Sequence, residues 1–418
     1  MFITRRCGSK ATDNRMKKYI SLFTGVGGLD LGLEAAGWEP AICVEIDSEA
    51  RAVAQANNPN WLFADRPDIH AYARDPETLV NYAGCRKDQI DLIAGGPPCQ
   101  PFSRAGTWHS GEVSGLRDPR AKTLRSMMAI VAHVLPRFVL IENVPGLRGG
   151  TDSPALPYLR GAFGRINRKN STNYVLSHFN LNAADYGVPQ LRKRLFLVAC
   201  REGTQFVAPH TTHSSDGRKK YVNCWTAIGN TKVSKSEAPL LSLRGKWADL
   251  LPSIPEGENY LWHTERGGGE PLFGWRTRYW TFLLKLAKDR PSWTILAQPG
   301  PATGPFHWEN RLLSIRELAR LQTFPNSIQF PVTYRSARLQ IGNAVPPLLG
   351  EVMGRLLRKE LGPALPKKRI WIPNRNLGRM PEPSGTSDVP PKFMNESGNH
   401  DPHPGTGRGP GARARRAA

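Results

Sequence analysis

Short apolar runs alternate with longer amphipathic stretches over the first half of the chain. The apolar runs lie at 19–23, 41–46, 91–96 and 138–144, and each is followed by a stretch with helical spacing. A short apolar run bounded by Gly-rich or polar residues is typical of a buried strand, and regular alternation with helices favours parallel strands. The pattern predicts an α/β fold with a doubly wound, mostly parallel sheet.

The same pattern predicts two domains. The alternation fills 19–202, gives way over 203–300 to irregular sequence rich in Gly, Pro, Trp and Tyr, and returns over 301–363. Within the returning part, 310–322 and 345–362 have helical spacing. We therefore expect one large α/β domain with a smaller irregular domain inserted into it.

Charge points to a polyanionic partner. The chain of 418 residues has a formal net charge of +22. A basic leader, 1–18, carries six basic residues against one acid, and a basic tail, 364–418, carries ten against four. Phosphate contacts by Lys and Arg dominate nucleic-acid affinity, although a merely solvated surface also accounts for such an excess. The tail is rich in Pro, Gly and Ser, and we expect it to be disordered.

Several classes of protein are excluded by what the chain lacks. No stretch approaches 18 uninterrupted apolar residues, and the N-terminus has no apolar run of the secretory type, so we expect no membrane association and an intracellular location. The six cysteines include no CxxC pair. This spacing predicts neither a zinc site nor a disulfide framework, and we expect no metal.

A Gly-rich turn follows the first expected strand. Gly25, Gly27 and Gly28 lie where the next helix opens, and Glu45 follows the second strand about 20 residues on. Glycines let backbone approach a ligand, and an acid at a strand end can bind ribose hydroxyls. Together they indicate an adenosine-containing ligand, either NAD or S-adenosylmethionine, although a tight turn and a surface acid explain each feature alone.

The strongest chemical signal is a cysteine in a proline-rich turn. The strand at 91–96 runs into Pro97 and Pro98, which restrict the backbone and fix the direction of Cys99. Glu142 ends the strand at 138–144, so both side chains are expected at the carboxyl edge of the sheet, where ligands bind. A lone cysteine is usually inert and buried, but a Gly- and Pro-rich tip favours a nucleophile with a nearby acid.

The order of motifs resembles that of the DNA (cytosine-5) methyltransferases of the bacterial restriction-modification type. The motifs are FTGVGG (23–28), VEID (44–47), PPCQ (97–100), ENV (142–144), YGVPQLRKR (186–194), RELARLQ (316–322) and GNAVP (342–346). The resemblance covers about 19–361. It implies a Rossmann-like, class I S-adenosylmethionine-dependent fold in which 203–300 is the target-recognition domain.

The resemblance implies four catalytic residues. Cys99 would add as a thiolate to carbon 6 of a flipped cytosine, which activates carbon 5 toward the methyl donor. Glu142 would protonate or hydrogen-bond ring N3. Arg194 would contact the cytosine carbonyl, with Arg192 and Gln190 supporting it, although both arginines can instead be phosphate ligands. A loop at 103–118, including Arg104, resembles a flap over the flipped base.

The resemblance also implies S-adenosylmethionine as the cofactor. Phe23 would stack on the adenine, Glu45 would bind the ribose hydroxyls and Asp68 the adenine amine. The chain departs from the family pattern at two places: Ser21 stands where many relatives carry an acid, and the segment 118–124 has an extra residue between Arg120 and Leu124. The residues expected to bind the cofactor are Phe23, Gly25, Gly27, Gly28, Leu29, Glu45, Ile46, Asp68, Ile69, Pro97 and Asn343.

The expected partner is double-stranded DNA, recognised by the variable region 203–300. Its basic residues are candidates for phosphate or guanine contacts, and its aromatic residues either pack beside them or form a core. The basic candidates are Arg244, Lys246, Arg266, Arg276, Arg278 and Lys285, and the aromatic ones Trp262, Trp275, Tyr279 and Trp280. The length of this region favours DNA over tRNA, whose cytosine-5 methylases have a short counterpart.

Biologically, the resemblance suggests a monomer of the bacterial cytoplasm, associated with the nucleoid. It would protect host DNA from a restriction endonuclease that acts on the same site, with no stable complex between the two. Three alternatives stay open at this point: an NAD-dependent dehydrogenase, a DNA-binding module without catalysis, and a tRNA methylase with the same chemistry.

Overall fold

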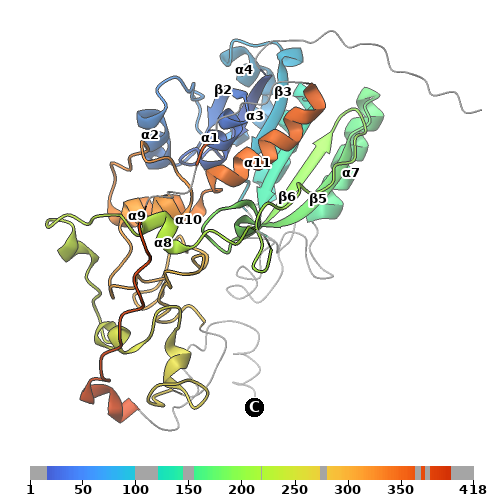
Figure 1. Cartoon of the computed structure of the whole chain (residues 1–418). Helices are drawn as coiled ribbons and strands as arrows, with labels where there is room; N and C mark the ends of the chain where they lie inside the picture. The colour runs from blue at the N-terminus through green and yellow to red at the C-terminus, as the bar shows by residue number, and fades with distance from the viewer. Residues whose placement is uncertain are drawn as a thin grey trace, which may run out of the picture.

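The structure is a computed structural model that describes residues 17–98, 121–144, 155–217, 219–273, 280–362, 369–371 and 377–396. A large lobe is built around one sheet, and a small lobe lies below it in Figure 1. The strands are β1 (Lys17–Leu22), β2 (Trp38–Val44), β3 (Ile90–Gly95), β4 (Phe138–Asn143), β5 (Val175–Asn182) and β6 (Lys193–Cys200). The α-helices are α1 (Gly28–Ala35), α2 (Ser48–Asn57), α3 (Ile69–Arg74), α4 (Pro76–Tyr82), α6 (Ala121–Val134), α7 (Ala155–Asn170), α8 (Cys224–Ile228), α9 (Ile315–Leu321), α10 (Tyr334–Asn343) and α11 (Pro347–Arg358).

The sheet has the order β2-β1-β3-β4-β6-β5. Strands β2, β1, β3 and β4 pair in parallel, whereas β6 runs antiparallel to both β4 and β5. The predicted mostly parallel sheet is confirmed. The chain moves outward from β1 to β2 and then returns to place β3 on the other side of β1. This reversal creates a crevice at the carboxyl ends of β1 and β3, where ligands of doubly wound folds bind.

Helices cover both faces of the sheet, which explains why its inner strands are mainly apolar. Ile20 and Leu22 pack into a core that includes residues of α3, α4, α6 and α7. Tyr19 faces the opposite core, which α1 and α11 close. Figure 1 shows α11 lying across that face. Residues buried on both faces of a strand produce continuous apolar runs, as the sequence shows.

The four strands expected from apolar runs occur within a few residues of their predicted positions as β1 to β4, whereas β5, β6, α3, α4 and α8 were not among the expected elements. β1 begins at Lys17, so the last two residues of the expected leader belong to the sheet. Helix α10 was not among the helices expected from periodicity. Its buried positions include Arg338, Gln340 and Gly342, and polar residues on the buried face obscure the apolar spacing that indicates a helix.

The small lobe has an aromatic-rich core of its own. Its fully buried members are Leu250, Leu251, Ile254, Tyr260, Leu272, Leu283, Phe306 and Phe393. By contrast, Cys224 and Ile228 of α8 pack with Leu318 of α9 in a third core that belongs to the large lobe. The region that begins at 203 therefore contributes to both lobes rather than forming one separate unit.

A C-terminal segment, 377–396, straps across the small lobe. The Phe393 ring is 1% exposed and stacks on Trp247, with 5.7 Å between ring centroids. The Ser387 amide donates to the Pro252 carbonyl at 3.1 Å, and Lys392 pairs with Asp249. Part of the tail that was expected to be disordered therefore packs on the small lobe, and the buried aromatic surface of Phe393 anchors this Pro-rich segment.

Two features are absent from the described residues. No helix among them combines the length and apolar character needed to cross a bilayer. No group of three or more His, Cys, Asp or Glu side chains in the same segments is placed to hold a metal ion.

Candidate active site

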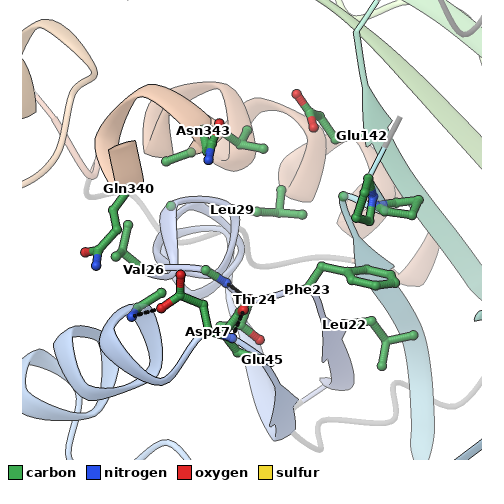
Figure 2. Close-up of a pocket in the computed structure, with 18 of the residues that line it drawn as sticks. Leu22, Phe23, Thr24, Val26, Leu29, Glu45, Asp47, Glu142, Gln340 and Asn343 are labelled. Carbon is green, nitrogen blue, oxygen red and sulfur yellow. Dashed lines mark hydrogen bonds between the residues drawn. The ribbon is translucent and has the colours of Figure 1, made fainter. Parts of the chain in front are cut away.

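The carboxyl ends of β1, β2, β3 and β4 meet around a pocket of about 500 Å³. The residues that follow each strand line it: Phe23 after β1, Glu45 after β2, Pro97 after β3 and Val144 after β4. Figure 2 shows Glu142 at one side of this pocket and Glu45 with Asp47 at the other. Its volume lies within the range of pockets that hold cofactor-sized ligands.

The glycines of the first turn are required by backbone conformation, by close packing, or by both. Gly25 and Gly27 have φ of 58° and 80°, a conformation that side chains disfavour. A Cβ at Gly28 would lie 2.3 Å from the Val345 carbonyl oxygen, so only glycine lets α1 begin against the C-terminal part of the chain. A Cβ at Gly25 would meet no atom within 4 Å, which places open pocket space beside its backbone.

Glu45 is held by backbone donors. The Gly25 amide donates to Oε2 at 2.6 Å and the Asp47 amide to Oε1 at 2.7 Å. Burial raises the pKa of the Glu45 carboxyl, and these hydrogen bonds oppose the shift. Each carboxylate oxygen keeps a further lone pair for a donor in the pocket. The carboxylate can therefore accept from two neighbouring hydroxyl groups.

Glu142 and Arg194 form the charged pair of the pocket. Arg194 Nε lies 3.0 Å from Glu142 Oε1, and both side chains are nearly buried. Burial raises the pKa of the Glu142 carboxyl, and the positive charges of Arg194 and Arg192 oppose this without cancelling it. A carboxyl group with a raised pKa can act as a proton donor near neutral pH.

The segment that leads toward Cys99 passes directly beside this pair. A Cβ on Gly96 would lie 3.2 Å from Glu142 Oε2, and the Asn143 amide group donates to the Pro97 carbonyl at 3.0 Å. β4 and the turn after β3 are thus fixed to each other. Cys99 itself, Arg104 and the loop 103–118 lie outside the described residues, so the structure places the residues up to Pro98 only.

Arg192 is placed differently from the expectation. It is fully buried and does not line the pocket. Its Nη2 donates to the carbonyls of Gly342 at 2.6 Å and Ala344 at 3.0 Å, and its Nη1 to that of Ile295 at 3.3 Å. Arg192 is therefore a positioning residue that ties β6 to the C-terminal part of the pocket wall, and it does not face a substrate.

The family model for C-5 cytosine-specific DNA methylases matches residues 17–359. The chain belongs to this family. It is 38% identical over 370 residues to the Type II methyltransferase M.SacI of Streptomyces achromogenes, with 82% of this chain and 93% of that protein covered. It is 31% identical over 353 residues to M.NgoFVII of Neisseria gonorrhoeae, with 82% and 87% covered.

Solved structures agree on the fold. A DNA modification methyltransferase encoded within an E. coli prophage superposes with a TM-score of 0.57 at 23% identity, covering 82% of this chain and 99% of that one. A Spodoptera frugiperda DNMT2 variant gives 0.55 at 17% identity, with 82% and 99% covered. As a cytosine-5 DNA methylase, the protein transfers a methyl group from S-adenosylmethionine to cytosine in DNA. The resemblance and the expected cofactor are thereby confirmed.

Most of the residues expected to bind the cofactor line the pocket, but three do not. The ones that do are Phe23, Gly25, Gly28, Leu29, Glu45, Ile46, Pro97 and Asn343. Gly27 sits behind them and packs on Trp61. Asp68 caps α3 by accepting from the His70 amide at 2.9 Å, and neither it nor Ile69 lines the pocket.

The sequence analysis missed Asp30, which lines the methylase pocket from the first turn of α1. Asp30 is 1% exposed and accepts a hydrogen bond from Tyr19 at 3.1 Å. Burial raises its pKa to about 6, while hydrogen bonds from Ser21 and Tyr19 oppose the shift. The signal that could have revealed it is a single acid on the buried side of an otherwise apolar helix.

The structure of the small lobe shows which of the candidate DNA-contacting residues are exposed and which are buried. Lys285 is 3% exposed and donates to the Ile254 carbonyl, so its expected DNA contact is wrong. Trp262 packs against the small-lobe core, whereas Trp280 is 42% exposed. The candidates Trp275, Arg276, Arg278 and Tyr279 lie outside the described residues.

Proposed function

We propose that Cys99, Glu142 and Arg194 carry out methylation of a cytosine that has been flipped out of duplex DNA. The observation that supports this most directly is the buried Glu142–Arg194 pair beside the segment Gly96–Pro98. A thiolate at Cys99 adds to carbon 6, and the ring then carries more electron density at carbon 5 and N3. After carbon 5 has accepted the methyl group, a base removes the carbon-5 proton and the bond between Cys99 and carbon 6 breaks, which releases the thiolate and the methylated cytosine. Glu142 donates a proton or hydrogen bond to N3, while Arg194 holds the carboxyl group and orients the base.

The pocket fits S-adenosylmethionine, which supplies the methyl group when bound. Phe23 provides an aromatic face, Glu45 accepts from the ribose hydroxyls, and backbone at Gly25 borders open space for the cofactor. Asp30 supplies a negative charge in the part of the pocket that it shares with Ser21. An acid from α1 would then replace the one that many relatives carry on the strand. Asp68 and Ile69 have no part in this proposal.

We further propose that residues of the small lobe recognise the DNA sequence, with 19–202 and 301–363 forming the catalytic domain. The separate aromatic core of the small lobe supports this division, because it can present a surface independently of the sheet. Flipping the target base costs roughly a few kcal/mol, which contacts on both lobes must supply.

The similarity to Type II methyltransferases supports a role in protecting host DNA from an endonuclease with the same recognition site. In this proposal the protein acts as a monomer in the bacterial cytoplasm, at the nucleoid, where its substrate is found. No stable complex with the endonuclease is required, since each enzyme acts on DNA by itself.

The test is transfer of labelled methyl groups from S-adenosylmethionine to duplex DNA by the wild type and by Cys99→Ser. We expect transfer by the wild type and none by the variant, with tRNA unlabelled in both cases. A duplex containing 5-fluorocytosine at the target should trap a covalent adduct only with the wild type. Equal transfer by both proteins would contradict the role of Cys99. Bisulfite sequencing of DNA from expressing cells would identify the methylated site.

A further inference from the structure

A second pocket, of about 600 Å³, lies where the small lobe meets α10. One wall consists of Arg244 and the loop 297–303. The opposite wall consists of Tyr334, Arg335 and Arg338, which lie on one face of α10 because residues three and four apart are neighbours on a helix. Three arginines therefore converge on this pocket, and among the described residues that line it none is acidic.

Arg338 is the unusual member of this arginine pocket. It is 6% exposed, and its Nε and Nη2 are buried without a hydrogen-bond partner. The Tyr334 hydroxyl donates to the Leu313 carbonyl at 2.8 Å and interacts with Arg338 as an acceptor. Burial lowers the pKa of Arg338, and Tyr334 alone opposes the shift. Leaving buried charged donors without acceptors costs several kcal/mol of free energy. A bound anion would supply acceptors for this guanidinium and remove that cost.

The walls of the arginine pocket are rigid. A Cβ on Gly342 would lie 2.5 Å from the Ala297 Cα, which shows that the loop 297–303 is packed tightly against the end of α10. The Leu312 amide donates to the Leu241 carbonyl at 2.8 Å, which fixes the segment before Arg244. At the other end of α10, the Thr333 side chain accepts from the Ser336 amide at 3.2 Å. The helix N-terminus adds a favourable potential for an anion.

We propose that the arginine pocket binds a backbone phosphate of the DNA substrate. The inference rests on DNA being the substrate, and it goes further by assigning a site. A phosphodiester offers oxygens that accept from several guanidinium groups at once, and charge-assisted bonds of this kind are the strong ones. A guanine edge would engage one arginine in a bidentate manner and leave the others unpaired. Three converging arginines therefore fit a phosphate better than a base.

Helix α10 links this phosphate site to the catalytic pocket. Its N-terminal residues line the arginine pocket, and Gln340 and Asn343 near its C-terminus line the cofactor pocket. Its 10 residues span about 15 Å. With a rise of about 3.4 Å per nucleotide along one strand, the bound phosphate lies within roughly five nucleotides of the flipped cytosine. The arginine pocket would hold the duplex in register with the active site without recognising the base sequence.

The first experiment measures DNA affinity against salt concentration for a short duplex that contains the cytosine methylated by the enzyme. Arg335→Gln and Arg244→Gln change exposed residues, and Arg338→Gln removes the buried guanidinium. The matched control is Arg74→Gln, an exposed arginine on α3 that lines neither pocket. We expect each pocket variant to raise Kd by about tenfold and to lower the slope of log K against log salt by up to ~1.

The slope distinguishes one shared phosphate from several. Because all three arginines contact the same phosphate, the double variant Arg244→Gln with Arg335→Gln should lower the slope by about 1, as a single variant does. The control should leave slope and Kd unchanged. Pocket variants that match the control, or a slope that falls by about 1 for each arginine removed, would overturn the proposal. If Arg338→Gln does not fold, the two exposed positions decide the question.

The second experiment locates the phosphate. Neutral methylphosphonate replaces each phosphate in turn within about five nucleotides of the target. Methylphosphonate at one position should weaken DNA binding by the wild type. The same replacement should not weaken DNA binding by Arg335→Gln any further, because the two changes remove the same contact. Relaxed preference at one guanine with an unchanged salt slope would instead indicate base recognition and overturn the proposal. The affinity of the same variants for S-adenosylmethionine should be unchanged, which distinguishes a loss of DNA binding from damage to the catalytic site.

Discussion

Asp30→Asn should stabilise the ligand-free protein more at pH 8 than at pH 5. Asp30 is buried against Tyr19 and Ser21, and its pKa is raised from the ordinary 3.8 to about 6 by burial. The groups that face it from neighbouring elements are the Tyr19 phenol on β1, the Cys43 thiol on β2 and Glu34 on α1 itself, and none of these is cationic. Folding therefore favours the protonated acid.

The sign and size of the effect follow from this shift. The contribution of Asp30 to stability is fully present below about pH 4 and is lost as the pH rises through about 6. Between pH 5 and pH 8 the free energy of unfolding of the wild type should fall by about 1.4 kcal/mol because Asp30 loses its proton. The neutral amide of Asn cannot titrate, so the variant should not lose this increment. The difference in free energy of unfolding between Asp30→Asn and the wild type should therefore increase by the same amount over this pH range.

Denaturant unfolding of both proteins at pH 5, 6, 7 and 8 measures the difference. Asp88→Asn, at an exposed position on the surface, serves as the control and should show no such dependence. A stability difference between Asp30→Asn and the wild type that stays constant from pH 5 to pH 8 would refute the reasoning. The same variant should bind S-adenosylmethionine more weakly while its affinity for the uncharged thioether product changes little, because only the sulfonium compound carries the positive charge that Asp30 attracts.

Two further predictions concern Glu142 and the C-terminal strap. Glu142→Gln should reduce kcat by about 10²- to 10⁴-fold with little change in cofactor affinity. Since the Glu142 pKa is raised and the protonated form is required, the wild-type rate should fall as the pH rises through that pKa, and a variant that keeps this pH limb would contradict the role. Phe393→Ala should destabilise the small lobe by about 3 kcal/mol and increase hydrogen exchange there, while Met394→Ala, 42% exposed, should have little effect. Equal exchange in the two variants would show that the strap does not stabilise the lobe.

The sequence predicted β1 to β4 well because these strands are largely buried on both faces. Apolar runs such as the one that became β4 have few alternative structures, and the Gly-rich turn before α1 is defined by local backbone geometry. The helix α10 was missed because its buried face carries Arg338 and Gln340, which are buried only in the context of the two pockets. Local pattern cannot reveal burial that tertiary structure creates.

The candidate site shows the same limit. Glu45 and Glu142 could be predicted as site residues because each stands at the carboxyl end of a predicted strand, and the structure places both in the pocket. Arg192 was expected near the substrate, but it lies one residue before β6 begins, and its guanidinium donates to the carbonyls of Gly342 and Ala344, which are distant in sequence. Asp30 was missed because its importance depends on its position on the buried face of α1, in the pocket that it shares with Ser21. Contacts between residues far apart in sequence decide these roles.

If the small lobe recognises the DNA sequence, as proposed above, the strap affects how that specificity can be exchanged between relatives. The small-lobe core combines residues between Leu250 and Phe306 with Phe393, which lies beyond the last helix of the large lobe. A graft that transfers only the central insertion would leave the Trp247 ring without its stacking partner. A transplantable specificity module of this methylase is therefore discontinuous, and chimeras should carry residues 377–396 together with the insertion from the same parent.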